Sequence, residues 1–343
     1  MKKRCLQSGS LCYIIPSCII FLLFFSRNER VRRRSTEMSG QKNNKSHIFM
    51  LLLAAFFWGT TFVAQSIGAD HVGAYTYLAG RSWIAVAFLT PVVHVMDRIS
   101  DKRGVNNRRP GTAAEKKLLI MAGVISGCTL FTASAAQQIG MAYTTASKAG
   151  FITALYVIIV PILSILVRKR PAPHIWFCVL LSLTGIYLLC MTSERFSLEL
   201  GDSYVLASAF LFAVEIMILD HFSPLVDGVR LSRMQFLVIA IISTGMMFLI
   251  DRPSWESIMK ALPAICYAGI FSSGIAYTLQ ILGQTDVNPT LASLVMSLES
   301  VFSALSGWLV LHESMSGREF AGCALMFGSI LLAQVEIKGK KPS

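Results

Sequence analysis

The chain has 343 residues, of which 54% are hydrophobic and only 15% are charged. Average globular proteins carry about 25% charged residues, so this composition argues against a soluble chain. The eight cysteines form no CxxC pair and mostly lie within apolar stretches, which disfavours a disulfide scaffold. The composition therefore predicts an integral membrane protein.

Residues 1–47 form a basic N-terminal extension. Its apolar stretch at 11–25 is flanked by basic residues and is shorter than the roughly 20 residues that a membrane-spanning helix needs. Three interpretations stay open: a signal peptide, an additional helix, or an upstream region that precedes a true start at Met38.

Ten apolar stretches follow, each close to the length of helix that crosses a bilayer of about 30 Å. Short connections with turn residues join them and leave no room for a soluble domain. In chain order the stretches cover residues 48–67, 75–96, 118–139, 144–167, 174–191, 204–219, 232–250, 262–282, 288–311 and 320–335. The predicted fold class is an all-α integral membrane protein with ten transmembrane helices.

The net charge of +12 is distributed unevenly among the connections. If the chain begins in the cytoplasm, the outer loops hold only Arg195, Arg252, Lys260 and Arg318, while 25 of the 31 lysines and arginines lie in cytoplasmic segments. This positive-inside bias predicts a multi-pass protein of the cytoplasmic (inner) membrane with both termini in the cytoplasm. The basicity thus marks topology, and we expect no nucleic-acid partner.

The two halves of the chain match at an offset of 143 residues, which relates Gly140 to Gly283. Eleven identical pairs, including Gln137 with Gln280, share this offset across three consecutive predicted spans. Because each half holds five spans, an odd number, the second copy must cross the membrane in the opposite sense. Inverted repeats are typical of transporters with a substrate site near the membrane midplane.

The domain organisation follows from this duplication. We expect a first five-helix repeat over 48–191 and a second over 202–336. A basic cytoplasmic tail, 337–343, ends the chain.

Five segments occur in an order and spacing that one family shares. They are AFFWGTTF at 55–62, Arg81, YTTASKAGFI at 143–152, Pro161, and a final group with NPT at 288–290, LES at 298–300 and HE at 312–313. Over residues 48–336 the chain resembles EamA-type, ten-helix members of the drug/metabolite transporter superfamily. Ser300 and His312 depart from that pattern, in which proline and glycine are usual, and this puts the local helix shape in doubt. The resemblance implies a secondary transporter or exporter whose cavity is lined by both repeats.

Four ionisable side chains lie within the predicted spans: Arg81, Lys148, Glu215 and Glu299. A charge at the bilayer centre costs at least about 2.5–3.5 kcal/mol, so such residues usually face the bundle interior or water. The carboxylates are candidates for a coupling proton or a substrate amine, and the cations for a substrate carboxylate. The structural alternatives are an internal ion pair, a hydrogen bond between helices or, for Lys148, a side chain that reaches the membrane surface.

Uncharged candidates complete the set of substrate-binding residues. The repeat-related amides Gln137 and Gln280 either bind a polar substrate or join helices. The remaining candidates are Trp58, Thr61, Tyr156 and Tyr277, for which packing is the alternative. Pro161 interrupts a predicted helix and is the candidate hinge for alternating access.

The sequence contains no HExxH, GxSxG or phosphate-binding loop, so we expect neither an enzyme nor a cofactor or metal site. We expect an alternating-access secondary transporter in the lipid bilayer, with a small-molecule substrate and a coupling proton. By family analogy the substrates are amino acids or their derivatives, moved outward. A homodimer is compatible with the sequence, and a receptor or scaffold without transport, or a channel, is the alternative function.

Overall fold

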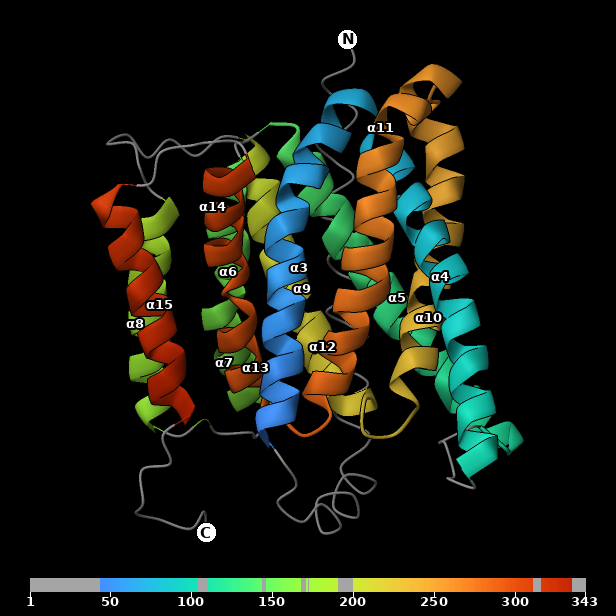
Figure 1. Ribbon diagram of the computed structural model, residues 1–343, viewed down its shortest axis with the longest axis horizontal. Coiled ribbons are helices and arrows are strands. Elements are labelled where there is room, and N and C mark those ends of the chain that lie inside the picture. The colour runs from blue at the N-terminus through green and yellow to red at the C-terminus, as the bar shows by residue number, and fades with distance from the viewer. Residues whose placement is uncertain are drawn as a thin grey trace.

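The computed structural model describes residues 44–103, 110–143, 146–167, 171, 173–190, 200–310 and 316–334. The N-terminal stretch at 11–25 and the tail at 337–343 lie outside these residues. Within them the chain is an all-helical bundle whose long helices run side by side in alternating directions (Figure 1). No strand occurs in this described part of the chain.

The first half of the chain supplies six helices. They are α3 (Asn44–His71), α4 (Ala74–Arg103), α5 (Ala113–Met141), α6 (Ala146–Ala154), α7 (Tyr156–Leu166) and α8 (Pro173–Cys190). The start of α5 shows why the chain turns into a helix here: Thr112 accepts a hydrogen bond from the Glu115 amide, and the Glu115 side chain bonds back to the Thr112 amide. This reciprocal cap satisfies amides that would otherwise lack partners.

The second half has the same order of long elements. They are α9 (Leu200–Phe222), α10 (Gly228–Met246), η1 (Met247–Asp251), α11 (Trp255–Tyr267), η2 (Ala268–Ala276), α12 (Tyr277–Gln284), α13 (Pro289–Met296), α14 (Glu299–Val310) and α15 (Gly317–Gln334). Asp227, Ser254 and Asn288 cap α10, α11 and α13, and Pro289 occupies the first turn of α13. The π-helical segments η1 and η2 continue the helices before them.

Seven of the described helices are long and apolar enough to cross a membrane. They cover Lys45–His71, Ala74–Ile99, Ala113–Met141, Leu200–Phe222, Gly228–Asp251, Trp255–Gln284 and Pro289–Ser306. Two shorter apolar helices, Ile152–Leu166 and Pro173–Leu188, lie among them. The predicted all-α multi-pass membrane fold is therefore confirmed, whereas the count of ten spans stays a prediction.

Two predicted spans, 144–167 and 288–311, are each interrupted by a short turn. The first breaks at Leu155, between α6 and α7, and the second breaks between Met296 and Glu299, ahead of α14. Pro161, the residue at which the sequence predicts a kink, lies buried inside α7. The interruption at Leu155 comes before it. The second break is followed by Ser300 and not by a proline. Neither interruption therefore has a proline at the break itself.

Close packing joins helices from the two halves of the chain. α5 packs on α9, α4 on α10, and α8 on α15. The pair of α8 and α15 lies at one edge of the bundle (Figure 1). α3 runs through the middle and contacts η2, α12 and α14. A Cβ at Gly59 of α3 would lie 2.6 Å from the Glu299 carbonyl oxygen, so only glycine permits this approach. The small residue places α3 directly beside the second break.

Polar contacts tie α4 to its partners at both ends. At one end Arg230 of α10 pairs with Asp97 of α4. At the other end Asp251 of η1 accepts hydrogen bonds from the Thr76 amide at 2.7 Å and the Thr76 hydroxyl at 2.9 Å. The beginning of α3 and the end of α15 lie at the same edge of the bundle as the end of α4 (Figure 1).

Candidate functional site

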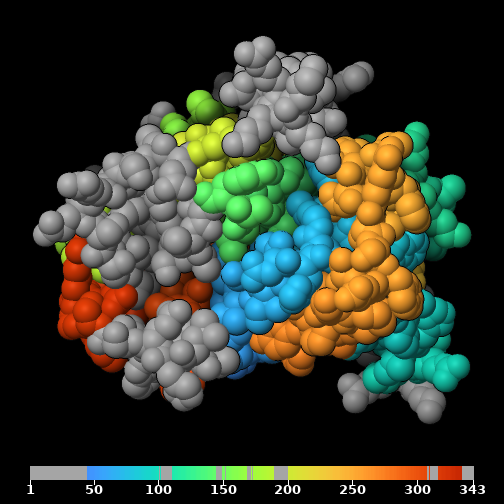
Figure 2. Space-filling model, turned by 90° about the horizontal axis from the view of Figure 1, so that it is seen from above, coloured from blue at the N-terminus to red at the C-terminus, as the bar shows by residue number. Residues whose placement is uncertain are grey.

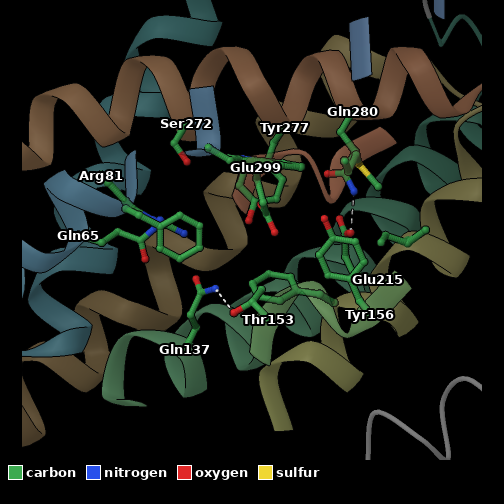
Figure 3. A pocket seen from close by; sticks show the side chains of 15 residues that line it. Gln65, Arg81, Gln137, Thr153, Tyr156, Glu215, Ser272, Tyr277, Gln280 and Glu299 are labelled. Atoms are coloured by element: carbon green, nitrogen blue, oxygen red, sulfur yellow. Dashed lines mark hydrogen bonds between the residues drawn. The ribbon is translucent and has the colours of Figure 1, made fainter. Parts of the chain in front are cut away.

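A pocket lies among the central helices, between the two halves of the chain (Figure 3). The space between its side chains, including the part open at its mouth, is about 510 Å³. Its lining residues are Trp58, Phe62, Gln65, Arg81, Gln137, Thr153, Tyr156, Phe212, Glu215, Ile216, Ser272, Tyr277, Gln280, Met296 and Glu299. All of them except Trp58 and Phe212 are buried. The pocket is therefore a chamber inside the bundle.

An apolar cluster adjoins this chamber near one face of the bundle. Phe62, Met141, Ile152 and Val205 pack together close to the end of α5 and the start of α9. On that face the ends of α3 and α5 lie against each other, with α11 beside α3 (Figure 2). A Cβ at Gly140 would lie 2.9 Å from the Gly201 carbonyl oxygen, so α5 and α9 meet almost backbone to backbone here.

The structure brings most of the predicted site residues into this chamber. Of the ten candidates, eight line it: Trp58, Arg81, Gln137, Tyr156, Glu215, Tyr277, Gln280 and Glu299. Thr61 is buried, but its hydroxyl donates to the Phe57 carbonyl of the same helix at 2.6 Å and it is not among the lining residues. Lys148 belongs to α6, and its side chain lies outside the described residues.

Glu215 is held by two amides in the interior of the bundle. It projects from α9, is 1% exposed, and accepts a hydrogen bond from Gln235 of α10 at 3.0 Å and one from Gln280 of α12 at 3.1 Å. No ion pair to Glu215 occurs among the described residues. Both carboxyl oxygens thus have neutral donors, an arrangement that links three helices.

Gln137, the repeat partner of Gln280, bonds to a different kind of acceptor. Its amide donates to the Thr153 hydroxyl of α6 at 3.1 Å. The first-half amide therefore binds a neutral group, while the second-half amide binds a carboxyl group.

Arg81 is a buried cation that has no acidic partner among the residues that the structure describes. It is 3% exposed, and one guanidinium nitrogen donates to the Ser134 hydroxyl of α5 at 3.3 Å. Its Nε atom has no hydrogen-bond partner, and no ion pair to Arg81 occurs in the described part of the chain. An arginine keeps its charge in a protein interior, so this position carries a positive charge with donors to spare.

Glu299 is the first residue of α14, directly after the second break. It is 6% exposed, and its Oε1 atom lacks a hydrogen-bond partner among the described residues. The amides at a helix N-terminus favour a negative charge. Arg81 lies at one end of the chamber and Glu215 with Gln280 at the other, with Glu299 and Tyr277 between them (Figure 3).

Aromatic rings form much of the remaining wall. The rings of Trp58 and Tyr277 meet edge to face, with 4.8 Å between their centroids. The ring of Phe236 packs against that of Tyr277, with 5.3 Å between the centroids. The indole nitrogen of Trp58 is buried without a partner in the described residues, and the hydroxyl of Tyr156 lies beside the Glu299 carboxyl group. The wall is thus apolar with a few unused polar atoms, as is common in ligand sites.

Seven lining residues were not predicted from the sequence: Phe62, Gln65, Thr153, Phe212, Ile216, Ser272 and Met296. Two of them had a usable signal, because Thr153 and Met296 are related by the same 143-residue offset as Gln137 and Gln280. Gln65 lies two helical turns after Trp58 on the same face of α3. The other four are ordinary membrane-helix residues that no pattern distinguishes.

Within the described ranges, no three His, Cys, Asp or Glu side chains are grouped closely enough to hold a metal ion. The functional groups of the chamber are instead one cation, two carboxyl groups, amides and aromatic rings.

Comparisons with known proteins agree with this architecture. The model of the EamA-like transporter family matches twice, at residues 45–191 and 199–334. An uncharacterized transporter of Archaeoglobus fulgidus is 27% identical over 292 residues, which cover 84% of this chain and 85% of that protein. The uncharacterized transporter YwfM of Bacillus subtilis is 26% identical, with 87% of this chain and 97% of that protein covered.

A solved crystal structure shares the fold at a TM-score of 0.69 with 19% identity, covering 85% of this chain and 97% of its own. The two family matches together span well over half of the sequence. The chain therefore belongs to the EamA-like transporter family and is a multi-pass membrane transporter.

Proposed function

We propose that the protein is a secondary transporter that moves small metabolites, such as amino acids or their derivatives, by alternating access around the central chamber. The observation that carries this proposal is that repeat-related positions from both halves meet there. Gln137 and Gln280, and likewise Tyr156 and Glu299, are 143 residues apart and line the same space. Inverted repeats place substrate sites at such an interface.

In this proposal ten helices form two inverted five-helix repeats, 48–191 and 202–336, and the termini are cytoplasmic. The positive-inside distribution of lysines and arginines supports that orientation. The breaks at Leu155 and ahead of Glu299 supply bending points beside the chamber, with Pro161 as a further hinge candidate. Outward movement, down a substrate gradient or against protons, is the direction that we expect.

Counterflow into proteoliposomes tests transport directly. Vesicles containing the purified full chain are loaded with a pool of unlabelled metabolites that spans cationic, anionic, neutral and zwitterionic compounds. We expect at least one labelled member to accumulate transiently above the level in protein-free vesicles. A monodisperse protein that gives no counterflow with any member contradicts the proposal.

Cysteine labelling tests the orientation at two glycines that tolerate a side chain. Gly111 precedes α5 and Gly317 begins α15, and a Cβ at either meets no atom closer than 3.9 Å. In a background without native cysteines, Gly317→Cys should react with a membrane-impermeant maleimide on intact cells, and Gly111→Cys should react only after lysis. The reverse pattern contradicts the predicted topology.

Substrate measurements in cells test the direction. Overproduction of an exporter lowers the cellular content of the counterflow substrate and raises its concentration in the medium. A rise inside the cell would instead identify an importer.

A further inference from the structure

The chamber contains two ionisable side chains of opposite type, Arg81 and Glu299, that form no ion pair with each other in the part of the chain that the structure describes. Among the described residues, Arg81 donates to the neutral Ser134 hydroxyl, and its Nε atom has no hydrogen-bond partner. Glu299 has an unused Oε1 atom, and neither residue forms an ion pair within the described residues. Charged groups in a membrane interior are normally paired or hydrated. A chamber with these two side chains therefore lacks an anion at one place and a cation at another.

Glu215 does not fill either role. Both of its oxygens already accept amide hydrogen bonds, from Gln235 and Gln280. It also lies at the end of the chamber opposite Arg81 (Figure 3). Glu299 lies beside the Tyr156 hydroxyl, but its Oε1 atom has no hydrogen-bond partner in the described residues and can receive a ligand.

We propose that the chamber selects zwitterions, with the anionic group of the substrate at Arg81 and its cationic group at Glu299. This inference rests on the proposed transport function and names its substrate class and orientation. A planar guanidinium binds a carboxylate through paired hydrogen bonds. The carboxylate of Glu299, at the N-terminus of α14, receives the substrate ammonium.

A singly charged molecule leaves one of the two charges without a partner. An organic acid satisfies Arg81 but leaves Glu299 unpaired, and an amine does the opposite. Leaving one buried charge unpaired is more costly than leaving a neutral group unpaired. The zwitterion is therefore favoured over both of its singly charged analogues.

The body of the substrate is expected to be apolar. The rings of Trp58, Tyr156 and Tyr277, together with Phe62 and Phe212, form most of the wall around the two charges. Aromatic rings bind apolar groups, and their faces also attract an ammonium group. The unpartnered indole nitrogen of Trp58 offers one further donor for a substrate oxygen.

Two matched sets of compounds test the selectivity in the counterflow assay. One set is phenylalanine, 2-phenylethylamine and 3-phenylpropionate, and the other is leucine, isopentylamine and 4-methylpentanoate. Within each set the body is constant and only the charged groups differ. We expect at least one zwitterion to be transported at least about tenfold faster than both of its analogues, which corresponds to about 1.4 kcal/mol of discrimination. If neither zwitterion exceeds its analogues, the proposal is wrong.

Charge-neutralising variants test the orientation. Arg81→Gln should lose transport of the zwitterion and retain or gain transport of the amine, because Glu299 still receives the ammonium. Glu299→Gln should show the opposite preference, for the acid. Lys260→Gln is the control, since Lys260 is exposed and pairs with Glu256 at the surface, and its substrate preference should match the wild type. Equal changes for acid and amine in both variants would overturn the assigned orientation.

Folding is measured separately for each variant by size-exclusion profile and melting temperature. A variant that does not fold is replaced by Arg81→Lys or Glu299→Asp, which keep the charge and shift its position. These should retain the zwitterion preference at a reduced rate, and loss of that preference would contradict the proposal. Counterflow of a compound without both charges, with none for the zwitterions, would leave the transport function standing and refute the zwitterion site.

Discussion

The two halves of the chamber share a plan but differ in charge. Each half has a broken helix beside the chamber and a glutamine on the helix that precedes it. The breaks and the glutamines of the two halves occupy positions related by the 143-residue offset. In the first half the amide of Gln137 binds Thr153, and Tyr156 follows the break. In the second half the amide of Gln280 binds Glu215, and Glu299 follows the break. The two halves thus share a scaffold, whereas both carboxyl groups of the chamber lie in the second half.

The only cation among the lining residues, Arg81, comes from the opposite half. The chamber is therefore polarised across the interface between the repeats. Movement of one half against the other, which alternating access requires, would change the separation between cation and carboxylates. In the proposed alternating-access mechanism the charge asymmetry therefore lies at the interface between the moving halves. Four predictions test this difference between the halves.

The largest effect is expected at the contact between α3 and the second break. Gly59→Ala places a Cβ 2.5 Å from the Phe302 Cβ and 2.6 Å from the Glu299 carbonyl oxygen, so the helices must separate. Overpacking of this kind costs about 1–3 kcal/mol. We expect a strong loss of folded yield and a lower melting temperature in detergent.

The control lies beside the first break. Gly150→Ala in α6 meets no atom within 4 Å and should be neutral or slightly stabilising, because alanine favours helix by roughly 0.5–1 kcal/mol over glycine. Equal melting temperatures for the two variants would show that the second break is not the tighter contact.

The next effect concerns energy coupling through Glu215. Glu215→Gln keeps the size of the side chain but removes its ability to bind and release a proton. We expect proton-gradient-driven accumulation to disappear, while exchange without a gradient continues. Accumulation by the variant at the wild-type level, and abolished by a protonophore, would assign the coupling to another group.

The repeat-related amides should differ in stability. Gln280→Leu removes a hydrogen bond to a carboxyl group, worth about 1.5–3 kcal/mol when that group is charged, whereas Gln137→Leu removes a neutral one, worth about 0.5–1.5 kcal/mol. The melting temperature should fall further for Gln280→Leu. A double-mutant cycle with Glu215→Gln measures the pair itself, and a coupling energy near zero would contradict the assigned role of Gln280.

The smallest effect is expected for Tyr156→Phe, the repeat equivalent of Glu299. The Tyr156 hydroxyl lies beside the Glu299 carboxyl group without an ideal hydrogen-bond geometry, so its removal should lower stability only slightly. A lost hydrogen bond to a neutral substrate group costs about 0.5–1.5 kcal/mol, or at most roughly tenfold in transport. If Tyr156→Phe reduced transport as strongly as Glu299→Gln does, the two breaks would not differ in function.

Much of the site was predictable because charge and symmetry are visible in a membrane sequence. Arg81, Glu215 and Glu299 stand out because few ionisable residues lie within apolar spans, and Gln137 and Gln280 stand out because they repeat. Thr61 was predicted on neighbourhood alone and instead bonds within its own helix. Phe212 and Ile216 could not be predicted, because apolar residues cover every side of a membrane helix and periodicity no longer identifies the inward face.

The sequence by itself determined the all-helical membrane class, the family, and the set of charges to be accommodated, since each of these follows from composition, spacing and repeated positions. Only the tertiary structure decided that Glu215 would be satisfied by two amides while Arg81 and Glu299 would each keep an unused polar atom. It also decided that both breaks would form at positions without proline. The physical reason is that hydrogen-bond partners and helix interruptions depend on which helices meet at a given depth, and residues far apart in the chain set that together.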